Sequence, residues 1–196
     1  MPIASIVWFK RDLRVTDHEP LSLAAQQGPL IALYIVEPDL WRQPDTSYRQ
    51  YQYLVDSIRS LDENLKDLGA HLVIRVGDAV EVLDALVQRW GVTHVFSHQE
   101  TGNHWTYDRD RRVQRWAKTR GVVWQESTQT GVVRRLQDRD GWAARWKATM
   151  QAPLVPGVLC RFSRCLRLRR WAWFRMAIRL FKWGVVRWRL RRCQHF

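Results

Sequence analysis

Short apolar runs alternate with amphipathic stretches along the first 126 residues of the chain. The clearest run, LIALYIV at residues 30–36, is continuously apolar, as expected for a strand that is covered on both faces. Other runs are shorter but of the same kind. Together they predict five strands, at residues 6–9, 30–36, 71–76, 94–97 and 122–125.

The stretches between these runs have the periodicity of helices. In the longest, Leu and Ile recur at steps of four and three, which places them on one face. Thr46 or Ser47 can cap its start, and Gly69 stands where a left-handed residue ends a helix. Asp78 and Asn103 are the expected caps of two later helices. The predicted helices cover residues 19–27, 47–68, 79–90 and 104–120.

Strands that alternate with helices at this spacing pair in parallel through right-handed crossovers. We therefore predict an α/β fold: a doubly wound, five-stranded parallel sheet of the Rossmann-like type, formed by residues 1–130. Residues 131–156 read as a linker with a short helix near residues 141–150. Residues 157–196 differ abruptly in composition and are treated as a basic tail.

The charge of the chain is concentrated in this tail. The formal net charge is +13, which by itself suggests a protein that binds polyanions. Residues 1–156, however, contain 20 Lys and Arg and all 19 Asp and Glu, whereas residues 157–196 contain the other 12 basic residues. The three cysteines also lie in the tail, in a spacing that indicates neither a disulfide framework nor a zinc site.

The N-terminus lacks the basic and apolar regions of a signal peptide, and no run of about 18 apolar residues predicts a spanning helix. We therefore expect a cytoplasmic protein without a transmembrane segment.

Familiar catalytic and phosphate-binding motifs are missing from the sequence. No G-x-G-x-x-G follows the first strand, no P-loop pattern occurs, and no Ser or Cys lies in a nucleophile-elbow context. His94 and His98 are four residues apart, but they span a predicted strand end rather than one helical face. We predict no catalytic residue and no metal site.

Candidate binding residues follow from topology. Ligands of open parallel sheets bind at the carboxyl ends of the strands, where residues 10–14, 37–49 and 98–103 would converge. A mixed-charge cleft of this kind suits a polar heteroaromatic ligand better than a bare phosphate. Position alone favours the alternative, in which these are ordinary loop residues and Asp12 or Asp17 caps a turn. The candidates are Arg11, Asp12, Glu37, Arg49, Gln99, Glu100 and Thr101.

Several segments resemble the photolyase–cryptochrome family. VWFKRDLRVTDHEPL, residues 7–21, is similar to its opening signature W-F-R-x-D-L-R-x-x-D-N, with Lys10 in place of the usual Arg and His18 in place of the usual Asn. The resemblance continues in order through LYIVEPDLW (33–41), Arg49, VFSHQETGNHWTYDRDRRV (95–113) and GVVRRLQDRDGWAARWKATMQAPL (131–154), and covers about residues 4–156.

This resemblance implies an antenna domain that binds a light-harvesting chromophore: a folate, a deazaflavin or a flavin. Arg11 and Arg49 would then pair with polar groups of the ligand, while Asp12, Glu37 and Glu100 would accept hydrogen bonds from it. In the family, the catalytic FAD and the DNA surface belong to a larger helical domain, which the 40 residues 157–196 cannot form. We therefore expect no bound catalytic FAD and no deoxyribodipyrimidine photo-lyase activity, hence no DNA repair, from this chain alone.

The resemblance also bears on partners. DNA would be reached only through the helical domain, which a separate polypeptide could supply, or non-specifically through the basic tail. Without that domain, we expect Leu136, Trp142 and Trp146 of the linker to be exposed.

The tail has three interpretations. It is a cationic arm that binds nucleic acid or an anionic membrane, a fragment of the flavin domain, or out-of-frame sequence. Its lack of any acidic residue, together with its enrichment in Arg and Trp, favours the third. The first leaves open an alternative function, a stand-alone α/β module with a cationic nucleic-acid- or membrane-binding arm.

Overall fold

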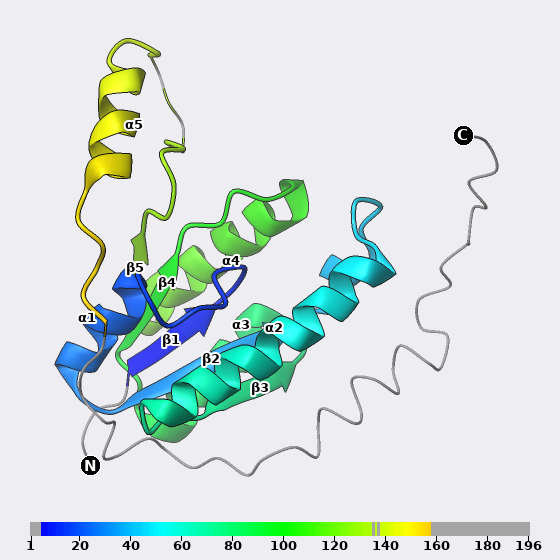
Figure 1. The fold of residues 1–196 in the computed structure, drawn as a ribbon. Coiled ribbons are helices and arrows are strands. Elements are labelled where there is room, and N and C mark those ends of the chain that lie inside the picture. Colours follow the sequence, from blue (N-terminus) through cyan, green and yellow to red (C-terminus); the bar gives the residue numbers. More distant parts are fainter. Residues whose placement is uncertain (1–4, 135, 137, 158–196) are drawn as a thin grey trace.

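The computed structural model describes residues 5–134, 136 and 138–157. In this part of the chain a single sheet has the strand order β3-β2-β1-β4-β5, and every neighbouring pair is parallel (Figure 1). The predicted five-stranded parallel α/β fold is confirmed. The strands are β1 (Ser5–Phe9), β2 (Leu30–Val36), β3 (Leu72–Val76), β4 (His94–His98) and β5 (Val123–Ser127).

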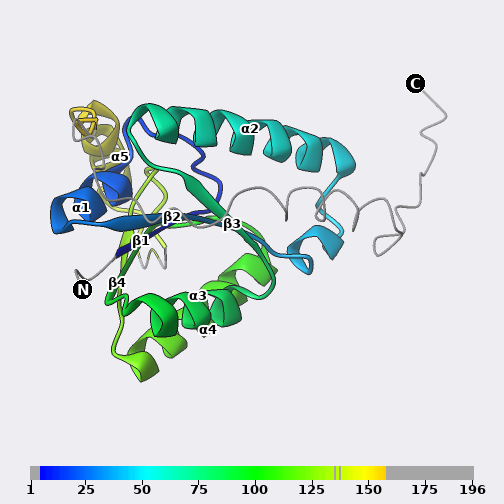
Figure 2. The same ribbon diagram turned by 90° about the horizontal axis from the view of Figure 1, so that it is seen from below.

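Helices cover both faces of the sheet (Figure 2). The helices α1 (Glu19–Gln27) and α2 (Tyr48–Asp67) lie on one face, and α3 (Ala79–Trp90) and α4 (His104–Arg120) lie on the other. The order of the strands reverses between β1 and β4, because β2 and β3 extend to one side of β1 and β4 returns to the other side. This is the position at which open parallel sheets bind ligands.

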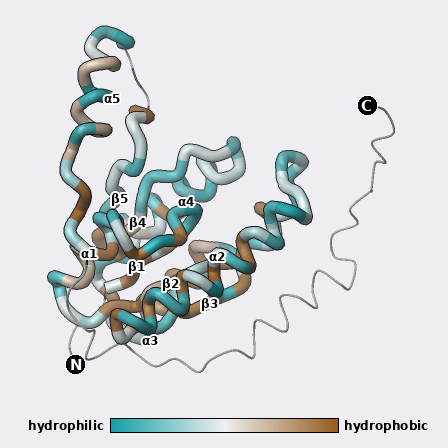
Figure 3. The backbone as a smooth tube through the Cα atoms, in the orientation of Figure 1, coloured by the Kyte–Doolittle hydropathy of each residue, from teal (hydrophilic) through white to brown (hydrophobic). Residues whose placement is uncertain are grey.

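Alternation along the strands divides the core into two clusters. Val7 and Phe9 pack with residues of α1 and α2, whereas Ile6 and Trp8 pack with residues of α3 and α4. In Figure 3 the hydrophobic colour is concentrated on the central strands β1 and β2. Burial on both faces explains why these strands have continuously apolar sequences.

Local sequence signals set the ends of the helices. Ser47, rather than Thr46, caps α2: its hydroxyl accepts from Gln50 N at 3.3 Å, and the Gln50 side chain accepts from Ser47 N at 2.6 Å. Asp78 and Asn103 cap α3 and α4 as predicted, and accept from backbone N–H groups at 2.9 and 3.0 Å.

Apart from one-residue shifts at the ends of other elements, two local features differ from the prediction. A short 3₁₀ helix, η1 (Leu40–Arg42), follows β2. An element of three residues is too short for a periodic sequence pattern to predict it. The strand β5 begins at Val123 rather than at residue 122, because Val122 N donates to Ala117 O at 2.9 Å and so completes the end of α4.

The segment after β5 extends away from the sheet (Figure 1). The predicted short helix is present as α5 (Trp142–Gln151); it has no buried residue and stands apart from the sheet in Figure 1. Trp142 and Trp146 are exposed, as expected, whereas Leu136 is partly buried. The chain then returns to the start of α1. Val155 N donates to Asp17 Oδ1 in the turn before this helix at 3.0 Å, and Ser22 of the helix donates from its hydroxyl to Pro156 O at 3.1 Å.

The division of the chain at residues 130 and 156 stays a prediction. Apart from residue 157, the tail lies outside the described residues, and so do the three interpretations of it. Within the described part, none of the helices combines the length and the apolar character needed to cross a membrane.

Candidate functional site: a cavity at the carboxyl edge of the sheet

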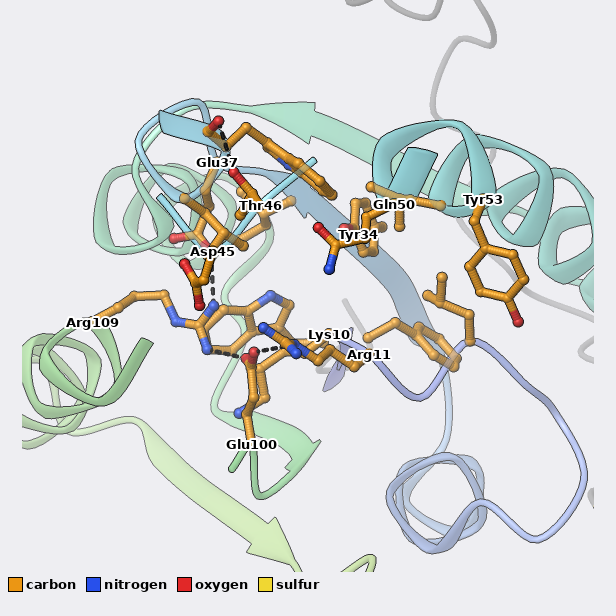
Figure 4. A pocket seen from close by; sticks show the side chains of 17 residues that line it. Lys10, Arg11, Tyr34, Glu37, Asp45, Thr46, Gln50, Tyr53, Glu100 and Arg109 are labelled. Atoms are coloured by element: carbon orange, nitrogen blue, oxygen red, sulfur yellow. Dashed lines mark hydrogen bonds and ion pairs between the residues drawn. The ribbon is translucent and has the colours of Figure 1, made fainter. Parts of the chain in front are cut away.

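A cavity of about 410 Å³ lies at the carboxyl ends of β1 and β2 (Figure 4). Its walls come from the loop after β1, from η1 and the turn before it, from the first turns of α2, from Glu100 after β4 and from Arg109 of α4. Aromatic side chains form much of the wall: Trp8, Phe9, Tyr34, Trp41 and Tyr53. A mostly apolar cavity with a few polar groups is the usual form of a small-molecule site.

Three of the predicted residues line this cavity. Arg11 follows β1, Glu37 follows β2 and Glu100 follows β4, so the parallel strands deliver them to one edge. Arg11 Nε donates to Glu100 Oε1 at 2.7 Å, and Figure 4 shows the two side chains meeting across the lower side of the cavity.

The structure places the other four predicted residues elsewhere. Asp12 is buried and directed toward two histidines, Arg49 is exposed on α2, and Thr101 is exposed in the loop after β4. Gln99 lines a second cavity, whose other walls come from residues 128–134 and from the helix α5.

Arg109 connects the acidic groups of the site, and the sequence prediction missed it. Its guanidinium donates to Glu37 Oε2 at 2.8 Å, to Glu100 Oε2 at 2.6 Å and to Asp110 Oδ1 at 2.9 Å. It also lies over the ring of Trp8, 4.9 Å from the centroid. Although burial alone would lower it, the three carboxylates hold the pKa of Arg109 above its ordinary value.

A signal for Arg109 is present in the sequence of α4. The buried face of this helix includes Val113 and Ala117, and the positions three and four residues before Val113 are Asp110 and Arg109. Charged residues at core positions of a helix mark a buried ionic network, since an unpaired charge there costs several kcal/mol.

The network extends to the segment after β5. Arg134 donates to Asp110 Oδ2 and Glu126 Oε2, both at 3.0 Å, and to Glu100 O at 2.7 Å. Lys10, where the family signature has Arg, lies 3.4 Å from Glu126 Oε1 and 3.6 Å from Asp110 Oδ2. Arg134 therefore fixes the loop that carries Glu100 into the cavity.

Glu37 is the member of this network with one unpaired oxygen. Its Oε2 is held by Arg109, but its Oε1 is buried without a hydrogen-bond partner. Burial raises the pKa of Glu37 to about 7, although the neighbouring guanidinium favours the charged form. The indole Nε1 of Trp41, also in the wall, is buried and unpaired as well.

Asp12 belongs to a separate buried cluster behind the cavity. Its Oδ2 accepts from His18 Nε2 at 2.7 Å and from His98 Nδ1 at 2.6 Å, and its Oδ1 accepts from Lys10 N at 2.8 Å. Although burial acts to raise it, the hydrogen bonds from the two histidines hold the pKa of Asp12 well below its usual range.

The ligand atoms of this cluster lie within 4.8 Å of one another, close enough to hold a metal ion. The hydrogen bonds indicate another role. His18 Nδ1 accepts from Leu21 N at 3.1 Å, so the ring proton lies on Nε2 and is donated to Asp12. A metal at Nε2 would displace that proton. The cluster instead ties the loop after β1 to the start of α1 and the end of β4.

The fold, the strand-end cavity and the buried network define an α/β domain with a cavity at the carboxyl edge of its sheet, and comparison with known proteins gives its family. A family model described as DNA photolyase matches residues 5–139. The chain belongs to the DNA photolyase family.

Relatives and solved structures agree with this assignment. Cryptochrome DASH of Gloeobacter violaceus is 32% identical over 112 residues, which are 54% of this chain and 22% of that protein. Cryptochrome-1 of Arabidopsis thaliana is 37% identical over 93 residues, which are 47% of this chain and 14% of that protein.

Among solved structures, a class III photolyase from Agrobacterium tumefaciens has a TM-score of 0.63 and 26% identity, over 72% of this chain and 29% of that one. A photolyase from Sulfolobus tokodaii, at 19% identity and a TM-score of 0.59, shares the fold over 78% of this chain and 36% of that one. The chain thus spans between about a seventh and a third of the length of these proteins.

Proposed function

We propose that the cavity binds a planar heteroaromatic chromophore and that residues 1–130 act as an antenna domain. The observation that carries this proposal is a cavity with aromatic walls at the carboxyl edge of the sheet, to which the ends of three parallel strands bring Arg11, Glu37 and Glu100. Ligands of open parallel sheets bind at this edge, and a mostly apolar cavity with a few polar groups suits a ring system.

The size of the cavity limits the ligand. A volume of about 410 Å³ is near the lower end of the range of small-molecule sites, roughly 300–1,000 Å³. It suits one fused ring system with a short substituent: the ring of a folate, a deazaflavin or a flavin. The Sulfolobus tokodaii structure is described as having two FAD molecules, with the implication of a novel light-harvesting cofactor, and that protein shares this fold.

In this proposal the chain's own residues bind and orient the ring. Arg109 fixes the Glu37 carboxylate by holding Oε2, and the rings of Tyr51 and Trp41 meet edge to face, with centroids 5.2 Å apart. The bound group would absorb light and pass the energy to an acceptor flavin. In the family, that acceptor belongs to the helical domain.

The test is a binding titration with the full chain. Riboflavin, FMN, 8-hydroxy-5-deazariboflavin and 5,10-methenyltetrahydrofolate are each titrated, and binding is followed by ligand fluorescence and equilibrium dialysis. We expect one saturable site for at least one of them. Leu13 lines the cavity, so Leu13→Trp should fill it and weaken binding about tenfold or more.

The matched control is Leu154→Trp, the same substitution at an exposed position that does not line the cavity. It should bind as the unmodified chain does. If none of the four compounds binds, or if Leu13→Trp binds as well as Leu154→Trp, the proposed function is wrong.

A further inference from the structure

One hydrogen-bonded pair joins two walls of the cavity at the protein surface. Asn103 Nδ2 donates to both carboxylate oxygens of Asp45, at 2.9 and 3.0 Å, across 58 residues of sequence. Asp45 belongs to the turn between η1 and α2 and lines the cavity (Figure 4), whereas Asn103 directly precedes α4. Asp45 is exposed and Asn103 is partly exposed, so the pair lies where the cavity meets solvent.

The same two walls are also joined in the interior. There Arg109 Nη1 of α4 donates to Glu37 Oε2 at 2.8 Å, and both side chains are buried. The outer pair consists of one neutral amide on one carboxylate. Water competes for both of its groups, so it breaks more readily than the buried ion pair. The walls are therefore held firmly inside and weakly at the rim.

The turn that carries Asp45 lies between two complete elements, so it can move without unfolding them. The helix η1 ends before it, and α2 begins after it with its own cap, Ser47. Thr46 Oγ1 donates to Trp41 O at 3.1 Å, which keeps the base of the turn on η1. Across the cavity, the turn is held by the bonds from Asn103. Breaking these bonds frees the tip of the turn and leaves its base in place.

The start of α4 holds the Asn103 side of the pair in position. Asn103 Oδ1 accepts from Thr106 N at 3.0 Å, and Thr106 Oγ1 donates back to Asn103 O at 2.9 Å. The loop is tightly packed here, since a Cβ at Gly102 would lie 2.5 Å from Thr106 Oγ1. Movement at the rim therefore falls to the turn with Asp45.

We propose that the Asp45–Asn103 pair is a latch at the rim of the cavity, which sets how fast a ligand enters and leaves. This inference rests on the proposed function and adds kinetic control of the same site. When the pair breaks, the turn moves aside and the ligand passes. Because the two side chains bond to each other rather than to the ligand, breaking the latch raises both rate constants and leaves the dissociation constant nearly unchanged. A side chain that binds the ligand would act mainly on the dissociation rate, and so on the affinity.

One substitution opens the latch and keeps the helix cap. In Asn103→Asp, one carboxylate oxygen still accepts from Thr106 N, since Asp caps helices as well as Asn does. The other oxygen faces the Asp45 carboxylate, and the two groups repel each other. Asn64→Asp, the same change at an exposed position of α2, is the matched control.

The association and dissociation rate constants are measured by stopped-flow fluorescence with lumiflavin and the full chain. We expect Asn103→Asp to raise both about three- to tenfold, the kinetic effect of losing one hydrogen bond, and Asn64→Asp to raise neither. Adding Asp45→Asn to Asn103→Asp exchanges the two groups and places a donor opposite an acceptor again. Both rate constants should then return to within about twofold of those of the unmodified chain, because the two changes are coupled.

A second measurement needs no ligand. Amide hydrogen exchange of the free chain at residues 43–47 should be faster in Asn103→Asp than in Asn64→Asp, and slow again in the exchanged pair. Unchanged exchange in Asn103→Asp would overturn the inference, and so would a rise in the dissociation rate constant alone or an exchanged pair that does not reverse the effect. The proposed function fails separately, when none of the four chromophores binds; hydrogen exchange then still decides whether this pair holds the turn.

Discussion

Replacing Arg109 by Met tests whether the buried network is organised around this residue. Arg109 is 2% exposed, and it is within hydrogen-bond distance of carboxylates on Glu37, Glu100 and Asp110. Met retains much of the side-chain volume but removes the charge. Since Glu100 keeps its bond to Arg11, and Asp110 is also bound by Arg134, the loss falls mainly on Glu37.

Removing one partner of a buried ion pair costs about 3–5 kcal/mol, because the other charge is left without compensation. We expect a loss of this size in the free energy of unfolding at pH 8. The loss should be smaller at pH 5.5. Burial already raises the pKa of Glu37 to about 7 with Arg109 present, and without the guanidinium this carboxyl is still more easily protonated.

The sign of this pH effect follows from proton linkage. The pKa of Glu37 is raised in the folded protein from 4.5 to about 7, so the folded state binds more protons than the unfolded state between these values. The stability from Glu37 is therefore present below pH 4.5 and is lost as the pH rises through 7. Arg109→Met raises the pKa of Glu37 further, which widens the pH range between the unfolded and folded values. The loss of folding stability at high pH therefore becomes larger.

The assay is urea unfolding of the full chain, followed by circular dichroism at pH 5.5 and 8. The matched control is Arg111→Met on the same helix, where the side chain is 60% exposed and its partner Asp108 is 3.8 Å away. This exposed change should cost less than about 1 kcal/mol. A loss below about 1 kcal/mol for Arg109→Met at pH 8, or an equal loss at both pH values, would refute the reasoning.

Two further predictions concern residues around the cavity. Burial lowers the pKa of His18 from 6.5, although its hydrogen bond to Asp12 opposes this shift. The free energy of unfolding should therefore fall as the pH drops below about 6.5. Thermal melts of His18→Asn should show a smaller fall over the same pH range, and an unchanged slope would contradict the prediction. Arg134→Gln should loosen the loop that carries Glu100 and weaken lumiflavin binding several-fold, because Arg134 donates to Glu100 O. Arg139→Gln, the same change at an exposed position, should leave the affinity unchanged. Equal affinities of the two variants would show that Arg134 does not position Glu100 for binding.

Topology made part of the site predictable. Arg11, Glu37 and Glu100 each follow a parallel strand, and the carboxyl ends of such strands meet at one edge whatever the side-chain details. The same reasoning did not place Asp12. It follows Arg11 directly, but the chain bends after β1, and the Asp12 carboxylate accepts from Lys10 N at 2.8 Å on one oxygen. Its other oxygen accepts from His18 and His98, contacts that strand order does not predict.

The remaining features depend on distant contacts. Arg109 lies 72 residues from Glu37, and their contact exists only because α4 packs beside the end of β2. Trp41 reaches the cavity through η1, a three-residue element without periodicity. Helical periodicity does place Arg109 on the buried face of α4, but it cannot identify the carboxylates that Arg109 meets there.

A crystal structure of the full chain with lumiflavin tests most directly whether this cavity is a chromophore site. We expect the ring between the aromatic walls, at the carboxyl ends of β1 and β2. A ring bound outside the cavity, or no bound ring at a saturating concentration, would contradict this.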